Sequence, residues 1–128
     1  MIPVQDYISR EMAKPYRDGE TDCCNTADRW VLLCKGFSPL SRFGRPVKRS
    51  EDVQEWLSER WGMAGGVLRV MRVSGLPRTK EPTPGDVGLV KIRKEICMAI
   101  FTGKVWFSRN ERGIMLAKAD SFIRAWSV

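Results

Sequence analysis

The chain has 128 residues, of which 43% are hydrophobic and 29% charged, and 22 Lys and Arg against 15 Asp and Glu give a formal charge of +7. This composition is typical of a globular domain and excludes a disordered chain and a coiled coil. No apolar run approaches the roughly 20 residues of a membrane helix. The first residues lack the basic and apolar segments of a signal peptide, so we expect neither a membrane span nor a leader.

The first half of the chain has helical periodicity. Residues 4–13 predict an amphipathic helix that Pro15 ends. A second helix begins after Thr21 or Asp22, since either side chain can cap it, and ends at Gly36. Its core-facing stripe consists of Cys23, Ala27, Trp30 and Cys34.

A loop over residues 37–48 precedes the third predicted helix. Ser50 caps that helix and Gly62 stops it, with core packing favoured over ligand stacking for its tryptophans. Its buried face consists of Val53, Trp56, Leu57 and Trp61. Residues 67–73 fit either period, and we favour a short helix there. Residues 75–84 form a connector with three prolines.

From Gly85 onward the pattern changes to short apolar runs separated by turn residues. Antiparallel strands are predicted at 87–92, 96–102, 105–108 and 114–117, with an edge strand at 124–128. The sequence therefore predicts one α+β domain, mainly helical over 1–75 and mainly β over 85–128. Its N-terminal helices pack on a C-terminal antiparallel sheet.

The chain contains no histidine. This excludes Ser-His-Asp and Cys-His mechanisms in their usual form, as well as imidazole zinc sites. A base would have to be Asp, Glu, Lys or Tyr with a tuned pKa. We expect no cofactor and no metal.

The cysteines are Cys23, Cys24, Cys34 and Cys97, and no two have Cys-x-x-Cys spacing. This argues against a zinc ribbon or a thioredoxin motif and favours reduced, mostly buried thiols. On a helix, Cys24 points about 100° away from Cys23. We therefore expect the two thiols in different environments.

The positive charge is spread along the chain and is densest between Arg42 and Arg49. Without basic residues interleaved with aromatic ones, this pattern favours a solvated surface over a nucleic-acid site. The basic segment could alternatively dock onto an acidic partner.

Three segments carry a family resemblance: PYRDGETDCC (15–24) with ADRWV (27–31), PGDVGLV (84–90) and RAWSV (124–128). In this order they resemble a small family of tailed-bacteriophage proteins of uncharacterised function. That family is similar to the NlpC-type, papain-like cell-wall cysteine peptidases. The resemblance spans nearly the whole chain and implies the same helix-plus-sheet layout.

The resemblance also implies site residues. In the peptidases an Asp-Cys pair opens a helix and the Cys is the nucleophile, which matches Asp22 and Cys23. A Gly-Asp pair begins the first core strand, as Gly85 and Asp86 do here, and the next strand begins with the catalytic His. Here that segment reads ICMAIF (96–101), so Cys97, or a neighbour, stands where His is expected. A buried thiol is a poor base, and the family's chemistry is therefore expected to be lost while its fold is kept.

The resemblance implies a structural or assembly component of a phage tail, at its tip or baseplate. Such a component resides in the virion, is assembled in the host cytoplasm, and has the tail hub and distal tail proteins as partners. Peptidoglycan is a further candidate ligand. One alternative is an active peptidase or amidase that cleaves peptidoglycan during genome entry through Cys23 and a non-histidine base. Another, less favoured, is a basic module that binds nucleic acid.

Overall fold

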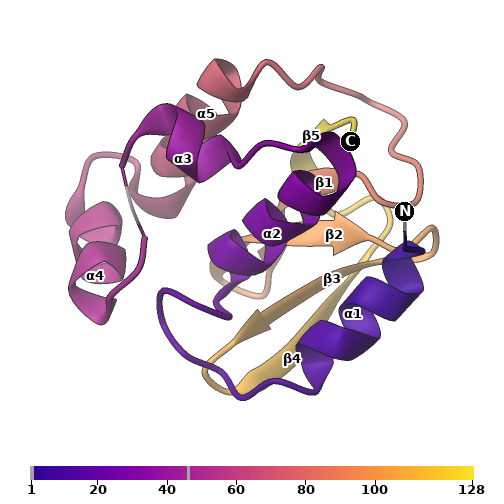
Figure 1. Ribbon diagram of the computed structural model, residues 1–128, viewed down its shortest axis with the longest axis horizontal. Coiled ribbons are helices and arrows are strands. Elements are labelled where there is room, and N and C mark those ends of the chain that lie inside the picture. The colour runs from indigo at the N-terminus through magenta and orange to yellow at the C-terminus, as the bar shows by residue number, and fades with distance from the viewer. Residues whose placement is uncertain (1, 46) are drawn as a thin grey trace.

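The computed structural model describes residues 2–45 and 47–128, in which helices precede strands (Figure 1). The helices are α1 (Val4–Met12), α2 (Cys23–Lys35), α3 (Pro39–Phe43), α4 (Ser50–Ser58) and α5 (Gly62–Ser74). The strands are β1 (Val87–Ile92), β2 (Glu95–Phe101), β3 (Val105–Asn110), β4 (Gly113–Lys118) and β5 (Phe122–Trp126). This arrangement confirms the predicted α+β class.

The strands form one antiparallel sheet in the order β4-β3-β2-β1-β5, and β5 is an edge strand as predicted. Helices α1, α2 and α5 contribute to the core on one face of this sheet, where α2 lies across the strands (Figure 1). Trp30 of α2 is central to that core and packs against Tyr7 of α1 with ring centroids 5.1 Å apart. This burial of aromatic and aliphatic side chains holds α2 on the sheet.

The opposite face of the sheet has a core of its own around Trp106. Gly88 pairs with Ala99 on one neighbouring strand and with Ala125 on the other, so a row of small residues crosses the sheet there. A Cβ atom at Gly88 would lie 2.7 Å from the indole of Trp106. The small row therefore makes room for the indole, and Phe101 packs beside it at 5.0 Å between centroids.

The predicted bounds of α2 are confirmed. Asp22, rather than Thr21, is the N-cap, and its carboxylate accepts a hydrogen bond from the backbone N–H of Asn25 at 3.0 Å. Gly36 ends the helix in the left-handed region at φ 80°, where glycine carries no Cβ penalty. On the predicted stripe, Trp30 is buried and Cys23 is half-buried.

The three segments behind the resemblance meet in space. The indole N–H of Trp30 donates to the carbonyl of Gly85 at 2.7 Å. The carboxylate of Asp86 accepts from the backbone N–H groups of Thr83 at 2.8 Å and Val128 at 3.1 Å. The Gly-Asp pair thus joins α2, the first strand and the C-terminal segment.

The helical layer formed by α3, α4 and α5 departs from prediction. The expected loop at 37–48 contains α3, because Ser38 caps a turn that begins with Pro39. Helix α4 begins at Ser50 after Arg49, and the carboxylate of Asp52 accepts the backbone N–H of Arg49 at 3.0 Å. This carboxylate performs the capping that we expected of Ser50.

The predicted buried face of the third helix is only partly correct. Trp56 is buried and Val53 is half-buried, but Leu57 is 46% exposed and Trp61 is 71% exposed. The helix ends at Ser58 instead of Gly62, because the chain reverses through Trp61 at φ 71° and Gly62 at φ 51°. The helix favoured at 67–73 is present as the longer α5.

The arginines between Arg42 and Arg49 are engaged within the chain. Arg42 donates a hydrogen bond to the carbonyl of Ser74 at 2.7 Å. Arg45 donates to both carboxylate oxygens of Glu59, at 2.7 and 2.5 Å. Pro46, inside this segment, lies outside the described residues. Arg42, Lys48 and Arg49 are nevertheless exposed, so the segment is solvated as expected, with these contacts added.

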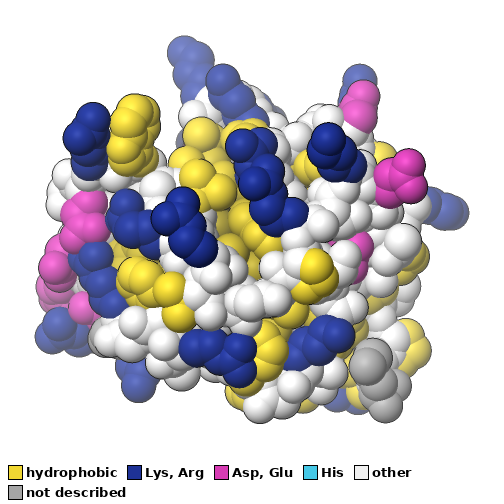
Figure 2. All heavy atoms as spheres, turned by 90° about the horizontal axis from the view of Figure 1, so that it is seen from above, with side chains coloured by type: hydrophobic (Ala, Val, Ile, Leu, Met, Phe, Trp, Pro, Cys, Tyr) yellow, Lys and Arg dark blue, Asp and Glu magenta, His cyan; other side chains and the backbone are white. Residues whose placement is uncertain are grey.

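Basic side chains are widely distributed on the surface. Figure 2 shows Lys and Arg side chains scattered among hydrophobic ones over one face, with Asp and Glu toward its rims. Within the described residues, no helix is long and apolar enough to cross a membrane.

Candidate functional site

Cys23 is the first residue of α2, and its position is fixed by the residues before it. The Asp22 carboxylate accepts hydrogen bonds from the backbone N–H groups of Gly19 and Asn25 and from the Asn25 side chain. Asn25 also donates to the carbonyl of Val47 at 2.7 Å. Asp22 therefore serves as a structural cap that sets the direction of the helix start.

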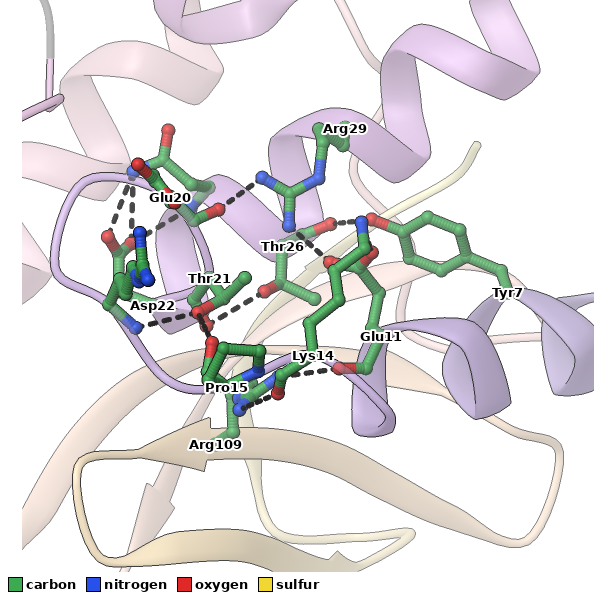
Figure 3. Close-up of polar contacts among 12 residues, drawn as sticks. Tyr7, Glu11, Lys14, Pro15, Glu20, Thr21, Asp22, Thr26, Arg29 and Arg109 are labelled. Carbon is green, nitrogen blue, oxygen red and sulfur yellow. Dashed lines mark hydrogen bonds and ion pairs between the residues drawn. The ribbon is translucent and has the colours of Figure 1, made fainter.

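A buried polar network holds the segment that leads into α2 (Figure 3). Buried Glu11 at the end of α1 forms ion pairs with Arg29 of α2 and with Lys14. Arg109 of β3 donates to the carbonyls of Glu11 at 2.6 Å and Lys14 at 2.9 Å, and Thr21 donates to the Pro15 carbonyl at 2.7 Å. The network joins α1, α2 and the sheet around the loop.

Sequence reasoning missed this network. Glu11 lies in the helix predicted over residues 4–13, and Arg29 is not part of the stripe predicted for the second helix. No local pattern pairs residues 18 positions apart, and Arg109 is 98 positions from the carbonyl it binds. Only the presence of charged residues at core-facing positions of their elements could have signalled it.

Three thiols gather at the start of α2. Cys23 packs against the cluster of buried side chains that contains Cys97 of β2. Cys24, like Cys23, also packs against the core beneath the helices, and its thiol contacts the Met63 sulfur at 3.3 Å. Cys23, Cys24 and Cys97 all line one cavity, so the expectation of separate environments for Cys23 and Cys24 is wrong.

The pKa of Cys23 is lowered. The main cause is a hydrogen bond from the Cys24 thiol, and the backbone N–H groups of Met98 and Cys24 act in the same direction against the effect of burial. This is the position in which the free N–H groups of a helix start favour a thiolate. A lowered pKa is what a thiol needs in order to act as a nucleophile.

The neighbours that could act as a base are held in their protonated forms. Burial, reinforced by the nearby Cys23, raises the pKa of Cys97 to about 12. Burial and the hydrogen bond to Asp18 raise the pKa of Tyr16. Both groups keep their protons at neutral pH, so neither can take one from Cys23 or from water.

The cavity beside the thiols measures about 610 Å³. Residues of α2, α4, α5, β2 and β3 line it, and most of its wall is apolar. The sulfur-containing side chains in this wall, besides the three thiols, are Met63, Met71, Met98 and Met115. A flexible apolar wall of this kind suits an apolar side chain or small apolar ligand.

Nothing in the described part of the chain gathers three or more His, Cys, Asp or Glu side chains in a way that could hold a metal ion. The four cysteines are free thiols. The site thus combines a thiol whose pKa is lowered with an apolar cavity, and the neighbouring Cys97 and Tyr16 stay protonated at neutral pH.

No curated protein and no solved structure matches the chain. One family model does match, over residues 3–128, and its description is Domain of unknown function (DUF6950). Because this match covers almost the entire sequence, the chain belongs to the DUF6950 family.

Proposed function

We propose that this protein is a structural or assembly component of a bacteriophage tail and a non-catalytic relative of the NlpC-type cysteine peptidases. It acts by binding other tail proteins, the hub and distal tail proteins among them. The proposal places it in the virion after assembly in the host cytoplasm.

One observation carries the non-catalytic part of the proposal. Cys23 stands at a helix start facing β2, where the resemblance expects a nucleophile, and Cys97 stands where it expects the base. The raised pKa of Cys97 keeps that position protonated at neutral pH. Acyl transfer by a thiol needs a partner that takes and returns protons, and Cys97 at that position cannot do so.

The tail location is supported by the resemblance of the three segments. Their mutual contacts through Trp30, Gly85 and Asp86 make them one structural unit. Such a unit can be retained for its shape after its chemistry is lost.

The test of the non-catalytic part restores the missing base. We expect the parent protein to leave peptidoglycan and its isolated peptides intact, and a Cys97→His variant to gain slow cleavage. The matched control is Cys97→His combined with Cys23→Ala, which should be inactive. Cleavage by the parent protein that is abolished by Cys23→Ala alone would contradict the proposal.

The test of the tail location uses particles of a phage that encodes the chain. We expect purified particles to contain it at a copy number that matches tail symmetry, or a deletion phage to yield defective tails. Normal, infectious particles from the deletion phage, together with absence of the chain from wild-type particles, would contradict this location.

A second candidate function, an active peptidoglycan peptidase, is favoured by the lowered pKa of Cys23. If the Cys24 thiol stabilises the thiolate, Cys24→Ala removes a donor and raises the pKa of Cys23. Alkylation rates measured across pH should then rise at higher pH in the variant than in the parent. Activation of Cys23 together with peptidoglycan turnover would favour the enzyme, whereas activation without turnover favours the binding role.

A further inference from the structure

The thiols at the start of α2 form a cluster that neither candidate function explains. Cys23 and Cys97 both line the cavity. Cys23 is half-buried, and Cys97 is only 4% exposed. Cys24 completes the cluster on the cavity wall. A peptidase that has lost its base needs no second or third thiol.

The geometry distinguishes Cys24 from Cys97 as possible disulfide partners of Cys23. Adjacent residues have Cα atoms about 3.8 Å apart, below the roughly 4.4–6.8 Å that a disulfide spans, and Cys23 and Cys24 are consecutive residues of a helix. Cys97 lies on another element, β2, within the side-chain cluster against which Cys23 packs. A bond from Cys23 to Cys97 would leave the helix intact, whereas a bond to Cys24 would unwind its first turn.

We propose that Cys23 and Cys97 form a redox-active pair in which a hydroperoxide oxidises Cys23 and Cys97 then closes a reversible disulfide between α2 and β2. This inference is independent of the tail location and of peptidase activity. It concerns the same cavity but a different reaction.

The reaction has two balanced steps. The Cys23 thiolate attacks one oxygen of the hydroperoxide, the O–O bond breaks, and the alkoxide or hydroxide that leaves takes a proton to give an alcohol or water. The Cys97 thiol then attacks the sulfur of the resulting sulfenic acid. An S–S bond forms, the S–O bond breaks, and the leaving hydroxide departs as water with the Cys97 proton.

Access and burial set the order of these steps. The cavity lets a small peroxide reach half-buried Cys23, while Cys97 on the same wall is only 4% exposed. Proximity offsets the weak nucleophilicity of a protonated thiol. Cys34 does not line this cavity, so it serves as an internal control.

The experiment treats the folded, reduced protein with a small molar excess of hydrogen peroxide, blocks free thiols and digests it with trypsin without reduction. We expect a loss of two hydrogens and a cross-link between the peptides of residues 18–29 and 95–104. A reductant should reverse both. Cys24→Ser should preserve the cross-link and also shows which thiol of the first peptide is bonded.

Cys97→Ser should lose the cross-link and accumulate a sulfenic acid on Cys23 that a 1,3-dione traps, while Cys34→Ser should behave as the parent. The proposal is overturned if the parent shows no peptide 18–29 to 95–104 cross-link. It is equally overturned if Cys24→Ser abolishes that cross-link. Because the parent alone decides the first outcome, a variant that fails to fold does not obscure the result.

Discussion

The region made by α2 and the sheet differs from the layer made by α3, α4 and α5 in whether the indole N–H groups of its tryptophans have hydrogen-bond partners. Trp30 and Trp106 each donate their indole N–H to a backbone carbonyl, at 2.7 and 3.0 Å. In the helical layer, the buried indole N–H of Trp56 has no partner among the described residues, and Trp61 is exposed with a left-handed backbone. These two tryptophans of the first region are therefore paired, whereas the helical layer has a buried tryptophan without a partner in the described part of the chain and a second one with a left-handed backbone.

The cavity lies between these two regions. Cys23 and Cys97 belong to the region of α2 and the sheet, whereas Met63 and Trp61 belong to the helical layer. The thiol side of the cavity thus belongs to the region with paired tryptophans, and the opposite wall to the layer with an exposed tryptophan and one that is unpaired within residues 2–45 and 47–128. Substitutions in the two regions should therefore differ in cost.

The largest expected effect is Gly88→Ala in the sheet. Its Cβ would lie 2.7 Å from the Trp106 indole and 3.1 Å from the backbone carbonyl of Arg124. Neither neighbour can move cheaply, because Trp106 is fully buried. We expect the free energy of unfolding to fall by about 3–4 kcal/mol, measured by chemical denaturation.

The control for Gly88→Ala is Gly113→Ala, whose Cβ would meet no atom within 4 Å. Gly113 also has a positive φ, so the control includes backbone strain but no clash. A loss in Gly88→Ala that is smaller than the loss in Gly113→Ala, where strain acts alone, would contradict the cost assigned to the clash with Trp106.

The second prediction concerns the buried ion pair. Arg29→Met removes the partner of Glu11, whose side chain is only 2% exposed, and leaves Lys14 alone to pair with it. We expect a loss of about 2–3 kcal/mol in unfolding free energy. Arg112→Met breaks a pair with Glu95 at 2.6 Å on the surface and should cost less than about 0.5 kcal/mol. Similar losses in the two variants would contradict the role given to the network.

The third prediction moves to the helical layer. At Gly66, a Cβ would overlap the Trp56 indole, but alanine also favours the helix by about 1 kcal/mol. We expect Gly66→Ala to cost a net 1–2 kcal/mol, or about half the effect in the sheet. In a Trp56→Leu background the same change should become neutral or stabilising, and a persistent cost there would rule out the overlap as its cause.

The sequence predicts the region of α2 and the sheet better than it predicts the helical layer. Asp22 and Gly36 bound α2, because a cap and a left-handed terminal residue act locally. The strand 87–92 is predicted in full because turn residues flank it. The end of α4 could not be predicted, since the chain reverses through Trp61 in a left-handed conformation that a tryptophan rarely adopts.

The candidate site divides in a similar way. The Asp-Cys pair at the helix start could be recognised because it is contiguous, and so could the unusual Cys97 within an apolar strand. The gathering of Cys24 and Met63 at one cavity could not, because the α5 segment that carries Met63 was expected to begin later in the chain. Cys24 and Met63 are 39 positions apart, and no periodic pattern in the sequence indicates a contact over that separation.

The smallest expected effect, with the opposite sign, is Trp61→Gly. A left-handed backbone costs a side-chain-bearing residue about 1–2 kcal/mol, part of which glycine loses to its greater freedom when unfolded. Trp61 is 71% exposed, so its removal gives up little burial. We expect unfolding free energy to rise by up to about 1 kcal/mol, whereas Trp61→Ala, which keeps the strain, should fall below the glycine variant. If the alanine variant is the more stable of the two, backbone strain at residue 61 does not determine the unfolding free energy. If the glycine variant is more stable than the parent protein, the tryptophan lowers stability. Such a cost is typical of residues kept for contact with a partner or ligand, here at the cavity.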